Sequence, residues 1–221
     1  VFVHFGDIGL FCIDLNGNLK WNYADPIPSS HWGAASSPIV VNDMLVMTYD
    51  ADHQSMTIGI DKRSGDEKWR ADRTSEIDPT QLYDAYSTPI VMERDGQTEV
   101  VHLACKLLEA YDPSTGQKRW SFSYPGEQPV ATPVVDQDKI IILGGKYAPY
   151  LGAVRIQNKG GQPSPDVVWQ ASRNLSDMPS PVVYDGLFYM VTKDGIASCI
   201  DAESGEYKWR KRMPGAYWAS L

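Results

Sequence analysis

The chain has 221 residues, with 20 Lys and Arg against 28 Asp and Glu, which gives a formal net charge of −8 at pH 7. Hydrophobic residues make up 43% of the chain, enough for a buried core, so a chain that is disordered by composition is excluded. The acidic balance argues against binding to nucleic-acid phosphates, and the longest apolar runs fall well short of the roughly 18 residues of a membrane-spanning helix.

A repeated turn follows the opening strand, VFVHF, and recurs along the chain. The segments IDLNGNLKW, IDKRSGDEKW, YDPSTGQKRW and IDAESGEYKW each contain an Asp, a Gly shortly after it, and a Trp four residues beyond the Gly. The Asp carboxylate can accept backbone N–H groups, as in an Asx turn, and the Gly allows a positive φ. We therefore predict a β-hairpin at each copy, formed around Asp14, Asp61, Asp112 and Asp201.

A second signature alternates with these turns. The segments SSPIVV, STPIVM, ATPVVD and PSPVVY contain prolines at positions 38, 89, 133 and 181. Between each proline and the following Trp, short runs rich in Val, Ile, Tyr and Met are separated by turn residues, a pattern that indicates four β-strands per unit. In the second unit we expect strands over 38–41, 44–49, 55–60 and 67–71.

One copy of the turn departs from the pattern. The segment AVRIQNKGGQPSPDVVW ends at Trp169, but its turn is longer, contains prolines and lacks the matching Asp. The spacing from one Trp to the next still stays between 40 and 51 residues. We therefore treat five residues as equivalent positions on outer strands: Trp21, Trp69, Trp120, Trp169 and Trp209.

Four antiparallel strands that repeat at this spacing are typical of the blade of a β-propeller, in the all-β class. A single blade leaves two apolar faces exposed, so blades must pack on their neighbours, and we expect the five Trp side chains to dock structurally across the seams. The predicted blades cover 33–83, 84–127, 128–175 and 176–216, with a partial blade at 1–32 that begins at its second strand and the start of another at 217–221.

The repeated turns resemble the pyrroloquinoline-quinone-like (PQQ-like) propeller repeat, whose tryptophan-docking motif reads approximately Ala-x-Asp-x-x-Thr-Gly-x-x-x-Trp. The copies at 60–69, 111–120 and 200–209 match it best, and the resemblance covers essentially the whole chain. It implies a ring of about seven or eight blades, of which this chain would form a partial ring of about five. A five-bladed ring closed by the two chain ends is the alternative, but few residues follow Ala219 to supply the missing inner strand.

The family resemblance leaves several functions open. Its members include quinoprotein dehydrogenases, which bind PQQ and calcium on the channel axis, and propellers without a cofactor. This chain looks most like bacterial envelope or secreted members and the outer-membrane-assembly lipoprotein propeller. We therefore expect a non-catalytic scaffold outside the cytoplasm, in the periplasm, the cell envelope or the medium, that binds a protein partner, a small ligand or a glycan. A segment of a PQQ-dependent alcohol or sugar dehydrogenase and a carbohydrate-binding propeller are the alternatives.

Candidate catalytic and metal-binding residues have structural explanations. A quinoprotein dehydrogenase would need an axial Asp base and calcium ligands, and often has adjacent cysteines, which this sequence lacks. The four repeated Asp residues are explained as turn formers. Residues 50–61, DADHQSMTIGID, partly match an EF-hand loop, but Ser55 stands where Gly is needed and the final Glu is missing. We therefore nominate no catalytic, cofactor-binding or metal-binding residue.

Aromatic residues are concentrated in the connections between predicted blades. These connections run from an outer strand to the next inner strand and cross one face of a propeller toward its channel. Aromatic rings beside polar groups are favoured on recognition surfaces because they bury a large area at a low entropic cost. Packing of the blade rims is the alternative explanation. The candidate interaction surface consists of His31, Trp32, Tyr83, Asp84, Tyr86, Tyr217 and Trp218.

Overall fold

The computed structural model describes residues 1–24, 30, 32–33, 35–51, 54–73, 84–173, 175–176 and 178–220. Within these residues the secondary structure consists of β-strands and one short 3₁₀ helix, Gly6–Ile8. The strands form five antiparallel sheets, and within each sheet they are hydrogen-bonded in sequence order. The predicted all-β propeller class is therefore confirmed, and no helix in the described ranges is long and apolar enough to cross a membrane.

The first sheet has three strands and the other four sheets have four each. The first contains β1 (Phe2–His4), β2 (Leu10–Ile13) and β3 (Leu19–Tyr23). The second contains β4 (Ile39–Val41), β5 (Met44–Ala51), β6 (Gln54–Asp61) and β7 (Glu67–Asp72). The third contains β8 (Ile90–Arg94), β9 (Gln97–Ala104), β10 (Leu107–Tyr111) and β11 (Lys118–Ser123). The fourth contains β12 (Val134–Asp136), β13 (Lys139–Gly144), β14 (Tyr150–Lys159) and β15 (Gln162–Ala171). The fifth contains β16 (Val182–Tyr184), β17 (Leu187–Val191), β18 (Ile196–Asp201) and β19 (Tyr207–Arg212).

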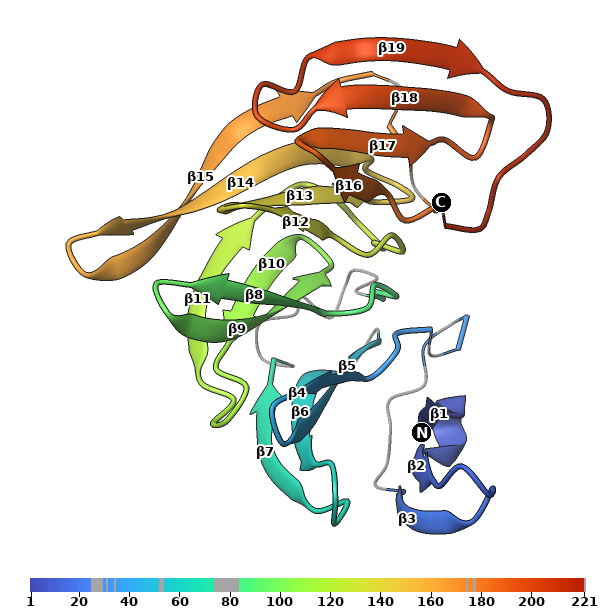
Figure 1. Cartoon of the computed structure of the whole chain (residues 1–221), viewed down its shortest axis with the longest axis vertical. Helices are drawn as coiled ribbons and strands as arrows, with labels where there is room; N and C mark the ends of the chain where they lie inside the picture. Colours follow the sequence, from blue (N-terminus) through green and yellow to red (C-terminus); the bar gives the residue numbers. More distant parts are fainter. Residues whose placement is uncertain are drawn as a thin grey trace.

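The five sheets follow one another along an arc in chain order, with the first and last sheets at opposite ends (Figure 1). The strands of the second sheet match the predicted ones to within two residues at each end. Each sheet falls inside one of the predicted blade ranges, while the residues at which one blade gives way to the next stay a prediction.

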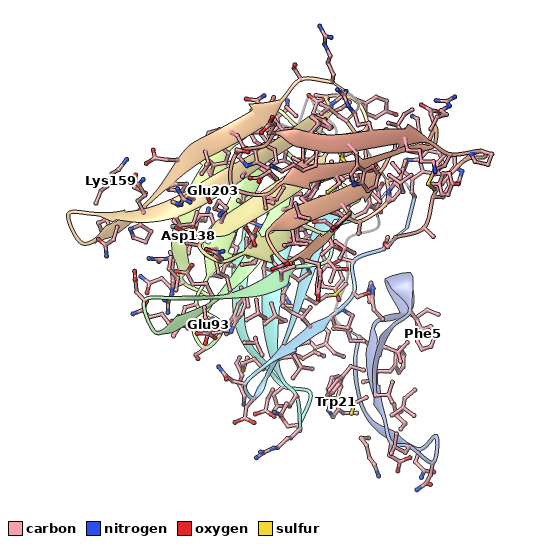
Figure 2. The ribbon with its side chains drawn as sticks, turned by 45° about the horizontal axis from the view of Figure 1, so that its top comes forward. Phe5, Trp21, Glu93, Asp138, Lys159 and Glu203 are labelled. Atoms are coloured by element: carbon pink, nitrogen blue, oxygen red, sulfur yellow. The ribbon has the colours of Figure 1, made fainter. Side chains whose placement is uncertain are left out.

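The hydrophobic core lies in the seams between neighbouring sheets. Each of its four clusters joins buried side chains from two consecutive sheets and includes one Trp. Trp21 packs with Leu45 and Ile58 at the first seam, where Figure 2 labels it. The later seams contain Trp69 with Val100, Trp120 with Ile140, and Trp169 with Phe188. Burial of apolar side chains between sheets therefore holds the arc together.

Three of the Trp side chains contact the hairpin turn of the following sheet. The indole N–H of Trp21 donates to the carbonyl of Lys62 at 3.2 Å, and that of Trp69 donates to the carbonyl of Pro113 at 2.9 Å. Trp169 donates in the same way to Ala202 at 3.0 Å. The acceptor residue directly follows the turn Asp in each case, so the turn and the preceding Trp form one repeated contact.

The turn Asp residues organise these hairpins as the sequence pattern predicts. One carboxylate oxygen of Asp61 accepts the backbone N–H groups of Arg63 and Ser64, and Gly65 has a φ of +81°. The Ser64 N–H, together with that of Arg63, lowers the pKa of Asp61 below its ordinary value. At Asp201 the Ser204 N–H, together with the Lys208 ammonium and the Ser204 hydroxyl, lowers the pKa to about 2. The Asx-turn prediction is therefore confirmed at these two hairpins.

Two Trp residues depart from the repeated contact. The indole of Trp120 donates instead to Glu99 of its own sheet at 2.9 Å, and its side chain is buried. The following sheet has the degraded turn copy, and its long β14–β15 hairpin projects from the arc, with Lys159 near its end (Figures 1 and 2). Trp209 is 48% exposed, and no described sheet follows β19. The structural docking role of the five Trp side chains stays a prediction.

Replacement of Gly116 by Ala tests the contact between turn and Trp. Gly116 has a φ of +71°, and an added Cβ would lie 2.4 Å from the Trp69 ring. Gly96 has a φ of +73°, but an added Cβ would have no neighbour within 4 Å. We expect Gly96→Ala to lower the free energy of unfolding by about 1–2 kcal/mol through backbone strain alone. Gly116→Ala should cost about 1–3 kcal/mol more, because the ring must move.

Urea unfolding of the two variants, measured side by side, gives the comparison. Because the two glycines have nearly the same φ, the difference between the variants isolates the contact with Trp69. Equal losses of stability in the two variants would contradict close packing between the turn and the indole ring.

Candidate functional site

The connections between sheets meet around one cavity, which we call the connection cavity. It has a volume of about 390 Å³. Its lining comes from the segments that precede β4, β8, β12 and β16, from the β13–β14 turn, and from the residues after β19. The lining residues are Trp32, Ala35, Tyr86, Gln128, Val130, Lys146, Met178 and Trp218. Segments far apart in the sequence are thus brought to one site by the repetition of the sheets.

Three residues of the predicted interaction surface line this cavity. Trp32 and Trp218 are 67% and 66% exposed, whereas Tyr86 is 8% exposed. Tyr217 does not line the cavity, and its hydroxyl donates to the carbonyl of Pro214 at 2.8 Å. His31 and Tyr83 lie outside the described residues. The structure therefore groups Trp32, Tyr86 and Trp218, and their role in binding stays a prediction.

Asp84 and Tyr86 form a buried pair beside the cavity. The Tyr86 hydroxyl donates to the Asp84 carboxylate at 3.0 Å, and the Tyr86 backbone N–H donates to the carbonyl of Pro129 at 2.8 Å. Burial and the neighbouring Asp84 charge raise the pKa of Tyr86, so its hydroxyl stays protonated at neutral pH. Tyr86 thus supports the wall of the cavity, while Trp32 presents its ring to solvent.

Lys146 and Gln128 line the cavity and were not predicted from the sequence. The Lys146 ammonium lies 5.3 Å from the ring centroid of Trp32 and 5.2 Å from that of Tyr147. Gln128 is 3% exposed and has a φ of +50°. Gln128 could have been found, because it lies in the connection that leads to the ATPVVD signature. Lys146 has no such signal, because it lies in a turn inside its sheet.

The lining of the connection cavity fits apolar recognition better than calcium binding. Most of its described lining residues are apolar or aromatic, and the single charged one is Lys146. The calcium ligands of a quinoprotein dehydrogenase include acidic side chains, and the described lining provides none of these. Elsewhere in the described ranges, no group of three or more His, Cys, Asp or Glu side chains lies close enough together to hold a metal ion. We therefore derive no chemical step through a cofactor.

A second hollow of about 410 Å³ lies along the first strands of the last three sheets. All of its described lining residues are apolar: Ile90, Val91, Pro133, Val134, Val135, Pro181, Val182 and Val183. The first strands of these sheets thus present an apolar wall without titratable groups. It offers no catalytic or ion-binding chemistry in the described lining.

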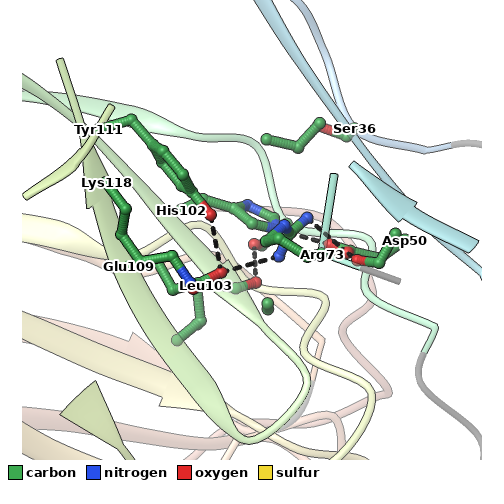
Figure 3. A network of polar contacts seen from close by, with 12 residues as sticks. Ser36, Asp50, Arg73, His102, Leu103, Glu109, Tyr111 and Lys118 are labelled. Carbon is green, nitrogen blue, oxygen red and sulfur yellow. Dashed lines mark hydrogen bonds and ion pairs between the residues drawn. The ribbon is translucent and has the colours of Figure 1, made fainter. Parts of the chain in front are cut away.

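A buried group of charged side chains joins the second and third sheets (Figure 3). The Arg73 guanidinium donates to Asp50 at 2.6 Å and to Glu109 at 3.0 Å, and the three side chains are at most 4% exposed. His102 also contacts Asp50, and the Tyr111 hydroxyl donates to Glu109 at 3.1 Å. Burial alone would raise the pKa of both carboxyl groups, but the Arg73 charge holds them below their ordinary values.

This buried group explains the part of segment 50–61 that the structure describes. Asp50 at the end of β5 points to Arg73 and accepts a hydrogen bond from Ser55 at the start of β6. The two strands pair as a hairpin, in agreement with the sequence prediction, and residues 52–53 lie outside the described part. The Asp50 carboxylate is therefore engaged in the seam between the second and third sheets.

Comparison with known proteins supports the fold. A family model described as "Outer membrane protein assembly factor BamB" matches residues 1–211. The crystal structure of BamB from Moraxella catarrhalis is 18% identical, with a TM-score of 0.71, and the match covers 99% of this chain and 62% of that chain. The computationally designed Ika8 protein is 14% identical, with a TM-score of 0.66 and coverage of 98% and 59%.

A quinohemoprotein alcohol dehydrogenase from Pseudomonas putida HK5 also matches, at 15% identity and a TM-score of 0.62, with coverage of 96% of this chain and 40% of that one. At these identities the structural likeness establishes the fold alone. The chain spans less than two thirds of the length of each of these three structures. A comparison with curated proteins finds no match.

Proposed function

This chain belongs to the outer membrane protein assembly factor BamB family, and from that membership we propose that it acts as part of a non-catalytic β-propeller scaffold that binds protein partners in the cell envelope. The family description concerns the assembly of outer-membrane proteins, and we extend that setting to this chain. Its proposed location is accordingly extracytoplasmic. The predicted relation to the PQQ-like propeller repeat agrees with this family.

The connection cavity is the observation that carries the proposal. Two exposed indole rings, Trp32 and Trp218, lie at a cavity with an otherwise mostly apolar lining. Exposed aromatic anchors beside a pocket are typical of the few residues that dominate the binding energy of protein interfaces. The seams between the sheets are packed with buried aliphatic and aromatic side chains, so the scaffold can hold these anchors in fixed positions.

Replacement of Trp32 by Ala tests this function. Because the Trp32 side chain is 67% exposed, its loss should leave the melting temperature nearly unchanged. Removal of an aromatic anchor should weaken partner binding by about tenfold or more. The measurement is the yield of proteins that co-purify, after chemical crosslinking, with the tagged full-length protein from the envelope fraction of its own cells.

Tyr184→Ala is the matched control, because Tyr184 is 74% exposed and lies at the end of β16, away from the cavity lining. Unchanged co-purification with Trp32→Ala, or an equal loss with both variants, would contradict the proposed function. The two alternative functions, a segment of a PQQ-dependent dehydrogenase and a carbohydrate-binding propeller, are tested on the same preparation. Quinone and calcium should produce no dye-linked dehydrogenase activity, and a glycan array should give no Trp32-dependent binding.

A further inference from the structure

The connection cavity presents three kinds of recognition group close together. Its walls are apolar and aromatic, with Trp32, Val130, Met178 and Trp218 among the lining residues. Such walls favour a side chain that loses little polar hydration when it is buried. A volume of about 390 Å³ is large enough for one aromatic or large aliphatic side chain together with its backbone.

Gln128 adds a polar group at the cavity wall. The residue is 3% exposed and belongs to the lining of the cavity. A Gln side chain offers both hydrogen-bond donors and an acceptor. A peptide group has the complementary acceptor and donor, so a bound polypeptide backbone can satisfy this amide.

Lys146 adds a positive charge at the same wall. Its ammonium lies over the rings of Trp32 and Tyr147, and the ion pairs found among the described residues do not include it. It is the only charged side chain in the described lining of the cavity. Charge complementarity therefore favours a ligand that places a carboxylate next to its apolar side chain.

From these three groups we infer that the connection cavity binds a segment of a partner polypeptide in which an aromatic or large aliphatic side chain is next to an acidic residue. The apolar side chain occupies the cavity, the peptide group pairs with the Gln128 amide, and the carboxylate pairs with Lys146. This inference rests on the proposed function, because it specifies the chemistry of the protein partner.

Three blocked peptides test the inference. The first contains the sequence Asp-Phe, and in the other two Lys replaces the Asp or Ser replaces the Phe. Fluorescence anisotropy of the labelled peptides should give an affinity of the wild-type protein for the Asp-Phe peptide at least about fivefold above that for either control. Equal binding of all three peptides, or no saturable binding of the Asp-Phe peptide up to about 1 mM, would overturn the inference.

Charge reversal at Lys146 makes the test specific to this wall. Lys146→Glu should weaken binding of the Asp-Phe peptide by about tenfold and shift the preference toward the Lys-Phe peptide. Lys159→Glu is the control, because Lys159 lies on the projecting hairpin (Figure 2). Gln128→Met keeps the length of the side chain but removes its amide, so it should weaken all Phe-containing peptides alike. The same loss in Lys159→Glu and Lys146→Glu would refute a role for this wall.

The results also separate this inference from the proposed function. If partner co-purification depends on Trp32 but the peptides are not distinguished, the inferred partner chemistry is wrong and the scaffold function stands. If Trp32→Ala leaves co-purification unchanged, the proposed function itself fails. Melting temperatures of all variants confirm that each comparison is made on folded protein.

Discussion

Replacement of Arg73 by Met is expected to lower the free energy of unfolding by about 3–5 kcal/mol. The Arg73 side chain is 4% exposed and pairs with Asp50 and Glu109, which are 2% and 0% exposed. Methionine has a similar length but no charge, so the two buried carboxylates lose the cation between them. Lys118 still pairs with Glu109, and His102 still contacts Asp50. Each of them reaches one of the two carboxylates, whereas Arg73 bridges both.

Arg63→Met is the matched control for this prediction. Arg63 is 80% exposed and pairs with Asp43 at 3.5 Å, an arrangement that contributes little to stability. We expect a change of less than about 0.5 kcal/mol in its free energy of unfolding. Similar urea midpoints for Arg73→Met and the wild type would show that the buried group is not needed at the seam.

The cost of Arg73→Met should depend on pH in a defined direction. In the wild type Arg73 lowers the pKa values of Asp50 and Glu109 below those of ordinary carboxyl groups. The ion pairs therefore contribute their full stability at a pH above the ordinary carboxyl pKa values, and this contribution is lost as the pH falls through the lowered pKa values. In the variant the same carboxyl groups can take up protons at higher pH and become neutral. The difference between variant and wild type should therefore be largest near pH 7 and should shrink below about pH 4.

Replacement of Trp120 by Ala is expected to lower the free energy of unfolding by about 3–5 kcal/mol. The side chain is 5% exposed and packs in the cluster that joins the third and fourth sheets, with Leu108 and Ile140 among its members. Its removal leaves a cavity in the seam and also removes the N–H that donates to the buried Glu99 carboxylate. The loss therefore combines apolar contacts with one hydrogen bond to Glu99, which keeps its ion pair with Arg94.

Trp209→Ala provides the comparison for Trp120, because it occupies the equivalent repeat position but is 48% exposed. Its replacement should cost clearly less, about 1 kcal/mol, because the indole loses little buried area. Urea denaturation followed by circular dichroism suits both variants, since the signal does not depend on the Trp that is removed. A loss below about 1 kcal/mol for Trp120→Ala would contradict its assigned role in the seam.

The repeated local pattern explains why so much of the fold could be predicted. The turn Asp and Gly act within a few residues of each other, so their spacing in the sequence directly determines the hairpin. The structure bears this out at Asp61 and Asp201, where backbone N–H groups meet the carboxylate. The exception at Trp120 follows from the long β14–β15 hairpin, whose altered turn was visible in the sequence but whose effect on the preceding Trp was not.

The candidate site could be predicted only in part. Trp32, Tyr86 and Trp218 lie in connections next to predicted blades, which the sequence analysis expected to cross one face of the propeller toward its channel. Lys146 joins them from inside the fourth sheet, and no local signal connects it to Trp32, more than a hundred residues earlier. The pairing of Arg73 with Asp50 and Glu109 is equally non-local, because it depends on how two sheets are packed. Which polar side chains pair across a seam, unlike the turns, cannot be deduced from spacing alone.

Site-specific photo-crosslinking tests the proposed interaction surface most directly. A photoreactive phenylalanine would replace either Tyr147 or Tyr184. Tyr147 is 60% exposed, and the Lys146 ammonium lies over its ring as well as over the ring of Trp32. Tyr184 is 74% exposed and lies at the end of β16. In living cells that produce the full-length protein, irradiation should yield a covalent complex with a defined protein from position 147 and none from position 184. No complex from position 147, or the same products from both positions, would contradict partner binding at the connection cavity.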